Sequence, residues 1–132
     1  MKEGDALKPV TREITQERIE RYAVAAGDFN PIHIDADFAS RSHFGRRIAH
    51  GMLVAATISE MMTLNYGQPW LRSGKLKLRL KAPVFPGDTV TARGQVKSAK
   101  EETGTRHVAC VVEVVRPDGE VAITGEATVT AA

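Results

Sequence analysis

The sequence is poor in the features that mark several large classes of protein. It holds one cysteine, Cys110, so a disulfide within the chain is excluded, and its small apolar neighbours predict a buried thiol. The formal net charge is only +2, with acidic and basic residues interspersed, which excludes the basic stripe of a nucleic-acid-binding protein. No apolar run approaches the roughly 20 residues that cross a bilayer, and residues 1–15 do not resemble a signal peptide. We therefore expect a cytoplasmic protein that binds neither nucleic acid nor membranes.

What the chain does contain is an ordinary globular composition. Hydrophobic residues make up 42% and charged residues 26% of the 132 positions, which argues against a disordered or fibrous protein. A chain of this length can bury about two-thirds of the surface that its unfolded form exposes. No repeat, low-complexity tract or linker interrupts the sequence, so we expect residues 1–132 to form a single domain.

Helices are predicted in the first half of the sequence. The spacing of apolar residues favours a helix over residues 14–27, with Thr15 as its cap. The loop that follows leads into a short helical turn that Asp35 can cap. Residues 51–64 are apolar nearly all round, so the helix they predict should be buried. Pro69 is expected to prevent this helix from resuming.

The second half changes to a period of two, which is typical of strands with one buried and one exposed face. Leucines alternate with basic residues in GKLKLRLKAPV at 74–84, and further strands are predicted over residues 89–97, 105–116 and 120–130. Residues 117–119, Pro-Asp-Gly, form a tight turn between the last two strands. We therefore predict an α+β fold in which an antiparallel sheet wraps around the long central helix.

The polar run GDFNPIH at 27–33 stands between two predicted helices and suggests a reaction centre. Pro31 keeps Asn30 out of the helical region, so the chain must turn sharply between Asp28 and His33. A carboxylate beside a neutral imidazole can hold one water from two sides, take a proton from it and deliver a proton nearby. Asn30 can orient the water or either partner, because its amide both donates and accepts. The alternative is a turn whose polar groups only satisfy the backbone.

A second polar feature, AHGM at 49–52, begins the buried helix. The Gly51 N–H is unpaired at that helix start and has no side chain beside it, so it can donate to a carbonyl oxygen that becomes negative. Together with Asp28 and His33, this donor fits the attack of water at the β carbon of an acyl thioester and protonation at its α carbon. His50 is expected to have a structural role, with its backbone and ring capping the helix.

The run GDFNPIH, the alanine at position 39 and IAHGM at 48–52 together resemble the signature of the MaoC-like dehydratases and (R)-specific enoyl-CoA hydratases. APVFPGDTV at 82–90 is similar to the segment that follows the central helix in that family, so the resemblance covers nearly the whole chain. It implies a hot-dog fold and an enzyme that reversibly hydrates trans-2-enoyl-CoA to (R)-3-hydroxyacyl-CoA without a cofactor. It also implies a homodimer or higher homo-oligomer whose sheets join edge to edge, with the acyl-CoA or acyl-carrier-protein thioester at the interface.

The same resemblance assigns roles to individual residues. The catalytic group would comprise Asp28, His33 and Asn30, and the thioester oxygen would be bound by the N–H of Gly51. Ser59 matches a hydroxyl often found near the pair. Two further residues are expected to line the pocket, Met52, whose thioether can fill irregular apolar space, and Phe29. Ala25 and Ala26 depart from the family, whose members more often carry an aliphatic residue and then serine or threonine, and this affects fine positioning rather than the chemistry.

Other interpretations of the same residues stay open. A thioesterase of this fold would direct water at the carbonyl carbon, and a non-catalytic partner subunit would bind the thioester and stabilise an active relative. A metal site built from His33, Asp35, Asp37 and His43 has no spacing typical of zinc, so we predict no metal. The basic residues that could contact CoA phosphates are equal candidates: Lys75, Lys77, Arg79, Lys81, Arg46, Arg47 and Arg72. The sequence leaves the acyl chain length, the carrier, the direction and the pathway open.

Overall fold

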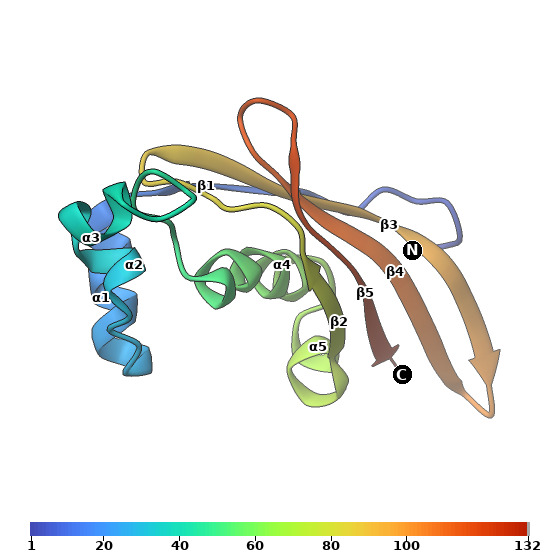
Figure 1. Cartoon of the computed structure of the whole chain (residues 1–132). Helices are drawn as coiled ribbons and strands as arrows, with labels where there is room; N and C mark the ends of the chain where they lie inside the picture. The colour runs from blue at the N-terminus through green and yellow to red at the C-terminus, as the bar shows by residue number, and fades with distance from the viewer. Residues whose placement is uncertain (132) are drawn as a thin grey trace.

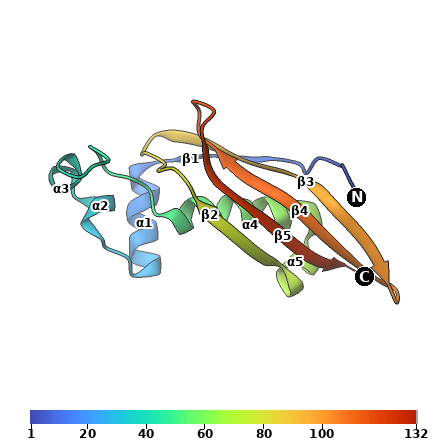
Figure 2. The same ribbon diagram turned by 45° about the vertical axis from the view of Figure 1, so that its right-hand side comes forward.

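An antiparallel sheet curves around one long helix in the computed structural model, which describes residues 1–131 (Figures 1 and 2). The elements follow one another as β1 (Val10–Ile14), α1 (Gln16–Ala26), α2 (Pro31–Ile34), α3 (Ala36–Ser40), α4 (Gly51–Tyr66), α5 (Gln68–Ser73), β2 (Lys75–Leu80), β3 (Asp88–Glu102), β4 (Thr105–Val115) and β5 (Val121–Ala131). The five strands lie in the order β1-β3-β4-β5-β2. The predicted α+β architecture is confirmed; the expectation of a single domain over 1–132 includes Ala132, which lies outside the described residues.

The helix α4 forms the centre of the hydrophobic core. Ile58, Met61 and Met62 are each 0% exposed, and the helix contacts β1, β3, β4 and β5. Burial of a large apolar side chain contributes about 1.5–3 kcal/mol, so this contact holds the sheet against the helix. The predicted burial applies to the side that faces the sheet, because Met52 and Leu64 on the same helix stay exposed.

The edge strand β2 packs closely against β5. Leu76 and Leu78 pack against the core while Lys75 and Lys77 are exposed, which confirms the predicted alternation for these residues. The expectation that Leu80 shares the buried face was wrong, because Leu80 at the end of the strand is 60% exposed. Gly125 of β5 is the register partner of Leu78. A Cβ atom at Gly125 would lie 2.3 Å from the Lys77 carbonyl oxygen, so a side chain at this position would push the two strands apart.

The start of the first helix differs from the prediction. Ile14 is the last residue of β1, where it is buried and pairs with Asp88 of β3. The helix α1 begins only at Gln16, and Thr15 caps it by accepting a hydrogen bond from the Arg18 N–H at 3.1 Å. The strand β1 was not predicted, because its five residues carry apolar side chains only at the two ends and show no period of two.

A second helix after α4 was also not predicted. Gly67, with φ of 62°, ends α4, and α5 then starts at Gln68. Pro69 lies in the first turn of α5, where a missing N–H costs nothing, so the expectation that it blocks further helix was wrong. Trp70 anchors α5 because its ring is buried in the core.

Other local predictions agree with the structure or need small changes. The Asp35 side chain caps α3 by accepting hydrogen bonds from the N–H groups of Asp37 and Phe38. Cys110 is buried, and burial raises the pKa of its thiol. The strand β3 continues to Glu102 beyond the predicted end at 97, because a bulge between Val96 and Ser98 preserves its pairing with β4. Within residues 1–131, no helix has the length and apolar character needed to cross a bilayer.

We expect Gly125→Ala to destabilise the fold, because the new methyl group would meet the backbone of β2. Overpacking of this kind costs about 1–3 kcal/mol, which urea denaturation would measure as a lower free energy of unfolding. Thr124→Ala on the same strand is the control and should change that free energy by only about 0.5 kcal/mol. Equal stability of Gly125→Ala and the wild type would contradict the close packing of β2 on β5.

Candidate active site

The loop between α1 and α2 is built to hold the Asp28 carboxylate. Gly27 ends α1 in the left-handed conformation, with φ of 70°. The Asp28 N–H donates to the Ala23 carbonyl at 3.0 Å, which fixes the first residue of the loop against the helix. The Asn30 N–H then donates to Asp28 Oδ1 at 3.2 Å. One carboxylate oxygen is thus tied to the loop, and Oδ2 remains for another donor.

Asn30 begins the next helix. Its side-chain oxygen accepts from the Ile32 N–H at 3.1 Å, and Pro31 occupies the first helical position, which suits its fixed φ. Asn30 therefore orients Asp28 through its backbone and starts the turn that carries His33 through its side chain. Of the two expectations for Asn30, orienting a partner or the water, the first agrees with these contacts, and the second stays a prediction.

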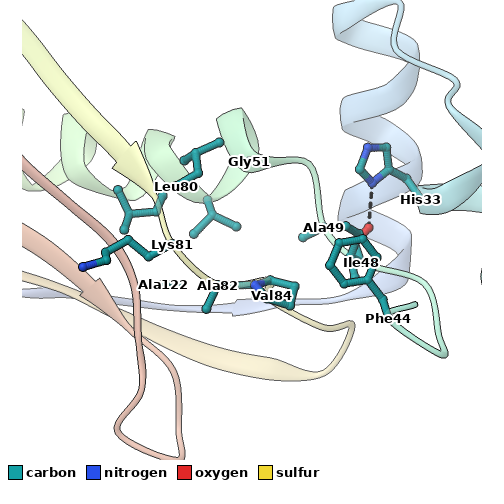
Figure 3. Close-up of a pocket in the computed structure, with 13 residues that line it drawn as sticks. His33, Phe44, Ile48, Ala49, Gly51, Leu80, Lys81, Ala82, Val84 and Ala122 are labelled. Atoms are coloured by element: carbon teal, nitrogen blue, oxygen red, sulfur yellow. Dashed lines mark hydrogen bonds between the residues drawn. The ribbon is translucent and has the colours of Figure 1, made fainter. Parts of the chain in front are cut away.

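His33 is oriented by a hydrogen bond from its ring to the backbone. Its Nδ1 lies 2.8 Å from the Ile48 carbonyl oxygen (Figure 3). A carbonyl only accepts, so Nδ1 carries the proton and Nε2 of the neutral ring is an acceptor. The Gln16 side chain donates to the His33 carbonyl at 2.9 Å, and the Ile48 N–H donates to the Ile32 carbonyl at 3.2 Å. These contacts tie α2 to the start of α1 and to the segment that enters α4.

A third polar side chain, His50, joins Asp28 and His33. One side-chain ligand atom from each of the three lies within 4.8 Å of the other two. The His33 and His50 rings stack with 3.9 Å between centroids and 29° between planes. His50 is the N-cap residue of α4, yet its side chain makes no capping bond; its Nε2 instead lies 3.0 Å from the Asp28 carbonyl oxygen. The expectation that its ring caps the helix was therefore wrong.

The three side chains also form a set of potential metal ligands, in which each ring already has one nitrogen bonded to a backbone carbonyl: His33 Nδ1 to Ile48 and His50 Nε2 to Asp28. The other possible metal site, which the sequence suggested, includes Asp35 and Asp37. Asp35 caps α3, and Asp37 forms an ion pair with Arg41 at 2.6 Å. Both carboxylates therefore already have structural partners.

An apolar cavity of about 320 Å³ opens beside His33. Figure 3 shows His33 and Lys81 at opposite sides of its lining. Most of the wall comes from small and aliphatic side chains of α4 and the residues before it, of β2 and the segment after it, and of β5: Ala49, Val54, Leu80, Ala82, Val84, Ala122 and Ile123. An acyl chain is the kind of group that such a wall can bind, because the wall offers few polar partners.

Gly51 lines the same cavity at the start of α4. As the first residue of the helix, its N–H has no partner within the helix, and the helix dipole adds partial positive charge there. A Cβ atom at Gly51 would lie 2.5 Å from Leu80 Cδ1. The absence of a side chain therefore lets the Leu80 side chain pack against the start of α4.

The three predicted pocket residues do not line this cavity within one chain. Phe29 and Met52 are 62% and 64% exposed. The Ser59 hydroxyl accepts a hydrogen bond from Trp70 Nε1 at 3.2 Å, which links α4 to α5. The assignment of Phe29, Met52 and Ser59 to the substrate pocket would require a second chain at the interface, and it stays a prediction. The sequence did not point to Phe44, Ile48 or the β5 residues of the wall, because only the tertiary fold brings them to this place.

A comparison with protein families decides the affiliation of the chain. The family model described as "MaoC like domain" matches residues 2–117. The chain belongs to the MaoC-like dehydratase family. Among curated members, an (R)-specific enoyl-CoA hydratase of Aeromonas caviae is 35% identical over 84% of this chain and 81% of its own length. An enzyme of the same name from Rhodospirillum rubrum is 37% identical over 98% of this chain and 87% of its own.

Solved structures of the MaoC-like family confirm the predicted hot-dog fold. The (R)-hydratase of A. caviae superimposes with a TM-score of 0.83 and 29% identity, covering 98% of this chain and 96% of the other. The R-hydratase of Pseudomonas aeruginosa in its unliganded form gives a TM-score of 0.84 and 28% identity, covering 98% and 81%. The family resemblance stated from GDFNPIH and IAHGM is therefore confirmed.

We expect Asn30→Ala to destabilise the protein by about 1 kcal/mol, because α2 would lose the acceptor that caps its first turn. Thermal unfolding followed by circular dichroism would measure the loss. Asn30→Ser is the matched control, since a serine hydroxyl can also accept at an N-cap position and should restore most of the stability. If the alanine and serine variants unfold at the same temperature, the capping role of Asn30 is refuted.

Proposed function

We propose that this protein catalyses the reversible addition of water to trans-2-enoyl-CoA, giving the (R)-3-hydroxyacyl thioester. The observation that carries the proposal is the gathering of Asp28 with His33, which lines an apolar cavity together with the first residue of α4. An acid-base pair, a space for an acyl chain and a free helix N–H are the three parts that this chemistry needs. The names of the curated relatives support the same reaction.

The tautomer of His33 gives a specific arrangement for the water. With Nδ1 bound to Ile48, Nε2 is an acceptor, and the Asp28 carboxylate also only accepts. A water between them would donate one hydrogen to each, which leaves an oxygen lone pair free to bond to C3 of the enoyl group. The two protein groups therefore orient the nucleophile as well as activate it.

The proposed reaction returns the pair to its starting state. As the oxygen bonds to C3, the C2=C3 π electrons move toward the thioester, and the Gly51 N–H stabilises the negative carbonyl oxygen. One water proton passes to the pair, and a proton from the pair is then delivered to C2. The net change is the addition of H and OH, and dehydration follows the reverse path with no cofactor.

The carrier and the assembly are further parts of this proposal. A relative from Arabidopsis thaliana, 30% identical over 97% of this chain and 76% of its own length, is a mitochondrial 3-hydroxyacyl-[acyl-carrier-protein] dehydratase, so thioesters of CoA and of acyl carrier protein both belong in a substrate panel. We propose a homodimer joined through β2, which is an edge strand with one free side and an exposed leucine at position 80. The cytoplasmic location stays a prediction.

We expect Asp28→Asn and His33→Gln to lower kcat for hydration of crotonyl-CoA by about 10²- to 10⁴-fold each, because each variant loses one side of the acid-base pair. The loss of enoyl thioester absorbance in the ultraviolet measures the rate. Both variants should unfold within a few degrees of the wild type. Wild-type turnover in both variants would refute the mechanism, and release of free thiol from a saturated acyl-CoA would indicate a thioesterase instead.

Gly51 offers a separate test of the oxyanion donor. Gly51→Pro removes the N–H at a first helical position, where proline is tolerated, and should lower kcat by about 10²- to 10³-fold. Gly51→Ala is the matched control, since it keeps the N–H and its methyl group meets only the flexible end of Leu80. The alanine variant should therefore retain much more activity. Equal rates for the two variants would mean that the thioester oxygen is bound elsewhere.

A further inference from the structure

We propose that His50 is a positioning residue, which holds the Asp28 loop and the His33 ring in their reactive arrangement. The inference rests on the proposed hydration reaction and adds a residue to it. His50 is 2% exposed and makes a contact with each member of the pair: a hydrogen bond to Asp28 and a ring stack on His33. Neither contact is one that a capping residue makes, so its conformation needs a different explanation.

The hydrogen bond determines which nitrogen of His50 carries the proton. Nε2 lies 3.0 Å from the Asp28 carbonyl oxygen, and a carbonyl only accepts, so Nε2 is the donor. The other nitrogen, Nδ1, is a buried acceptor with no hydrogen-bond partner among the described residues. A buried polar atom without a partner lowers stability. The fold keeps a histidine here although an apolar residue would avoid that cost, which points to a use for the Nε2 donor.

The ring stack restrains His33 in a direction that the Ile48 bond leaves free. The bond from Nδ1 to the Ile48 carbonyl fixes one edge of the His33 ring. The stacked His50 ring, with 3.9 Å between the two ring centroids, limits the tilt of the His33 ring. Tyr22 of α1 lies against His50 in turn, with 4.8 Å between ring centroids. His33 is therefore held at an edge and at a face, and its Nε2 can take few directions.

His50 also connects the acid-base pair to the oxyanion donor. It directly precedes Gly51, and its carbonyl oxygen accepts from the N–H groups of Leu53 and Val54 at 3.1 and 3.2 Å, which fixes the first turn of α4. The ring of the same residue is bonded to the Asp28 backbone. The distance between the water-holding loop and the Gly51 N–H is therefore set through one residue. We assign His50 no proton transfer, because its Nε2 proton is already used by the carbonyl.

Three substitutions separate the two contacts. His50→Gln keeps an N–H donor and loses the ring face, His50→Phe keeps the ring face and loses the donor, and His50→Ala loses both. We expect His50→Ala to lower kcat for crotonyl-CoA hydration by about 100-fold with KM within about threefold, since a displacement of 1 Å in a catalytic group has an effect of this size. The glutamine and phenylalanine variants should each recover about tenfold of that loss.

Thr57→Ala is the control for a general loss of stability. Thr57 is also a buried polar residue of α4, and its hydroxyl donates to the Val54 carbonyl within the helix. Its replacement should lower the unfolding temperature without a comparable change in kcat. The proposal is overturned if His50→Ala keeps wild-type kcat, if it changes KM rather than kcat, or if neither conservative variant is more active than the alanine variant.

The tautomers can be measured in the wild-type protein without any variant. Nitrogen-15 NMR of histidine-labelled protein should report His50 protonated at Nε2 and His33 protonated at Nδ1, which are opposite tautomers in stacked rings. Protonation of neutral His50 at Nδ1 would overturn the proposal, even if the variants fail to fold. Failure of the wild type to hydrate any enoyl thioester would refute the proposed function, whereas normal wild-type hydration with an unaffected His50→Ala would refute only the role of His50.

Discussion

The burial of α4 against the curved sheet is the constraint on which the rest of the structure depends. On the side of this helix that faces the sheet, Ile58, Met61 and Met62 are fully buried, and the helix contacts β1, β3, β4 and β5. Because the core fixes the whole helix, it also fixes the first residue, Gly51, at one end of the sheet. The loop with Asp28 and His33 lies at the same end, where α1, α2 and α3 are gathered (Figure 1). A hydrophobic contact thus sets the position of a polar site.

Hydrogen bonds then fix the orientation of the Asp28 and His33 side chains, whose approximate position is set by the core. The backbone N–H of Asn30 and the carbonyl of Ile48 each hold one side chain of the pair, and neither bond requires a further charged residue. Such bonds come from segments fixed by the fold, so they keep their direction when the substrate enters. In the proposed reaction this matters because water must present its lone pair to carbon rather than to the protein.

The sequence predicted best those features that depend on local pattern. The alternating leucines identify β2 by their period of two, and the apolar run of α4 identifies a buried helix by its length. The five residues of β1 gave no such pattern, since this strand is defined by its pairing with β3. Pro69 was taken as a stop, although the same residue type also begins helices. The strand β1 thus required tertiary information, whereas the error at Pro69 came from choosing between two local roles of proline.

In the candidate site too, the sequence predicted the local features and missed those that depend on the tertiary fold. Asp28 and His33 are five positions apart, so a short turn could bring them together, and the family motif supported this interpretation. His50 follows His33 by a longer interval that includes α3 and an irregular segment, and no local rule predicts that the two rings stack. The cavity wall was still harder to predict, because Leu80 and Ala122 belong to strands that are distant from His33 in the sequence.

The composition of that wall has a consequence for how such a protein can diversify. The acid-base loop and the start of α4 lie on the helical side of the cavity, whereas Leu80, Ala122 and Ile123 belong to the sheet or border it. Drift in these aliphatic positions can widen or narrow the cavity while residues 27–33 remain unchanged. In the proposed function, the residues that would select the acyl group and those that would transfer protons therefore lie in separate segments of the sequence, so substitutions in one set need not affect the other.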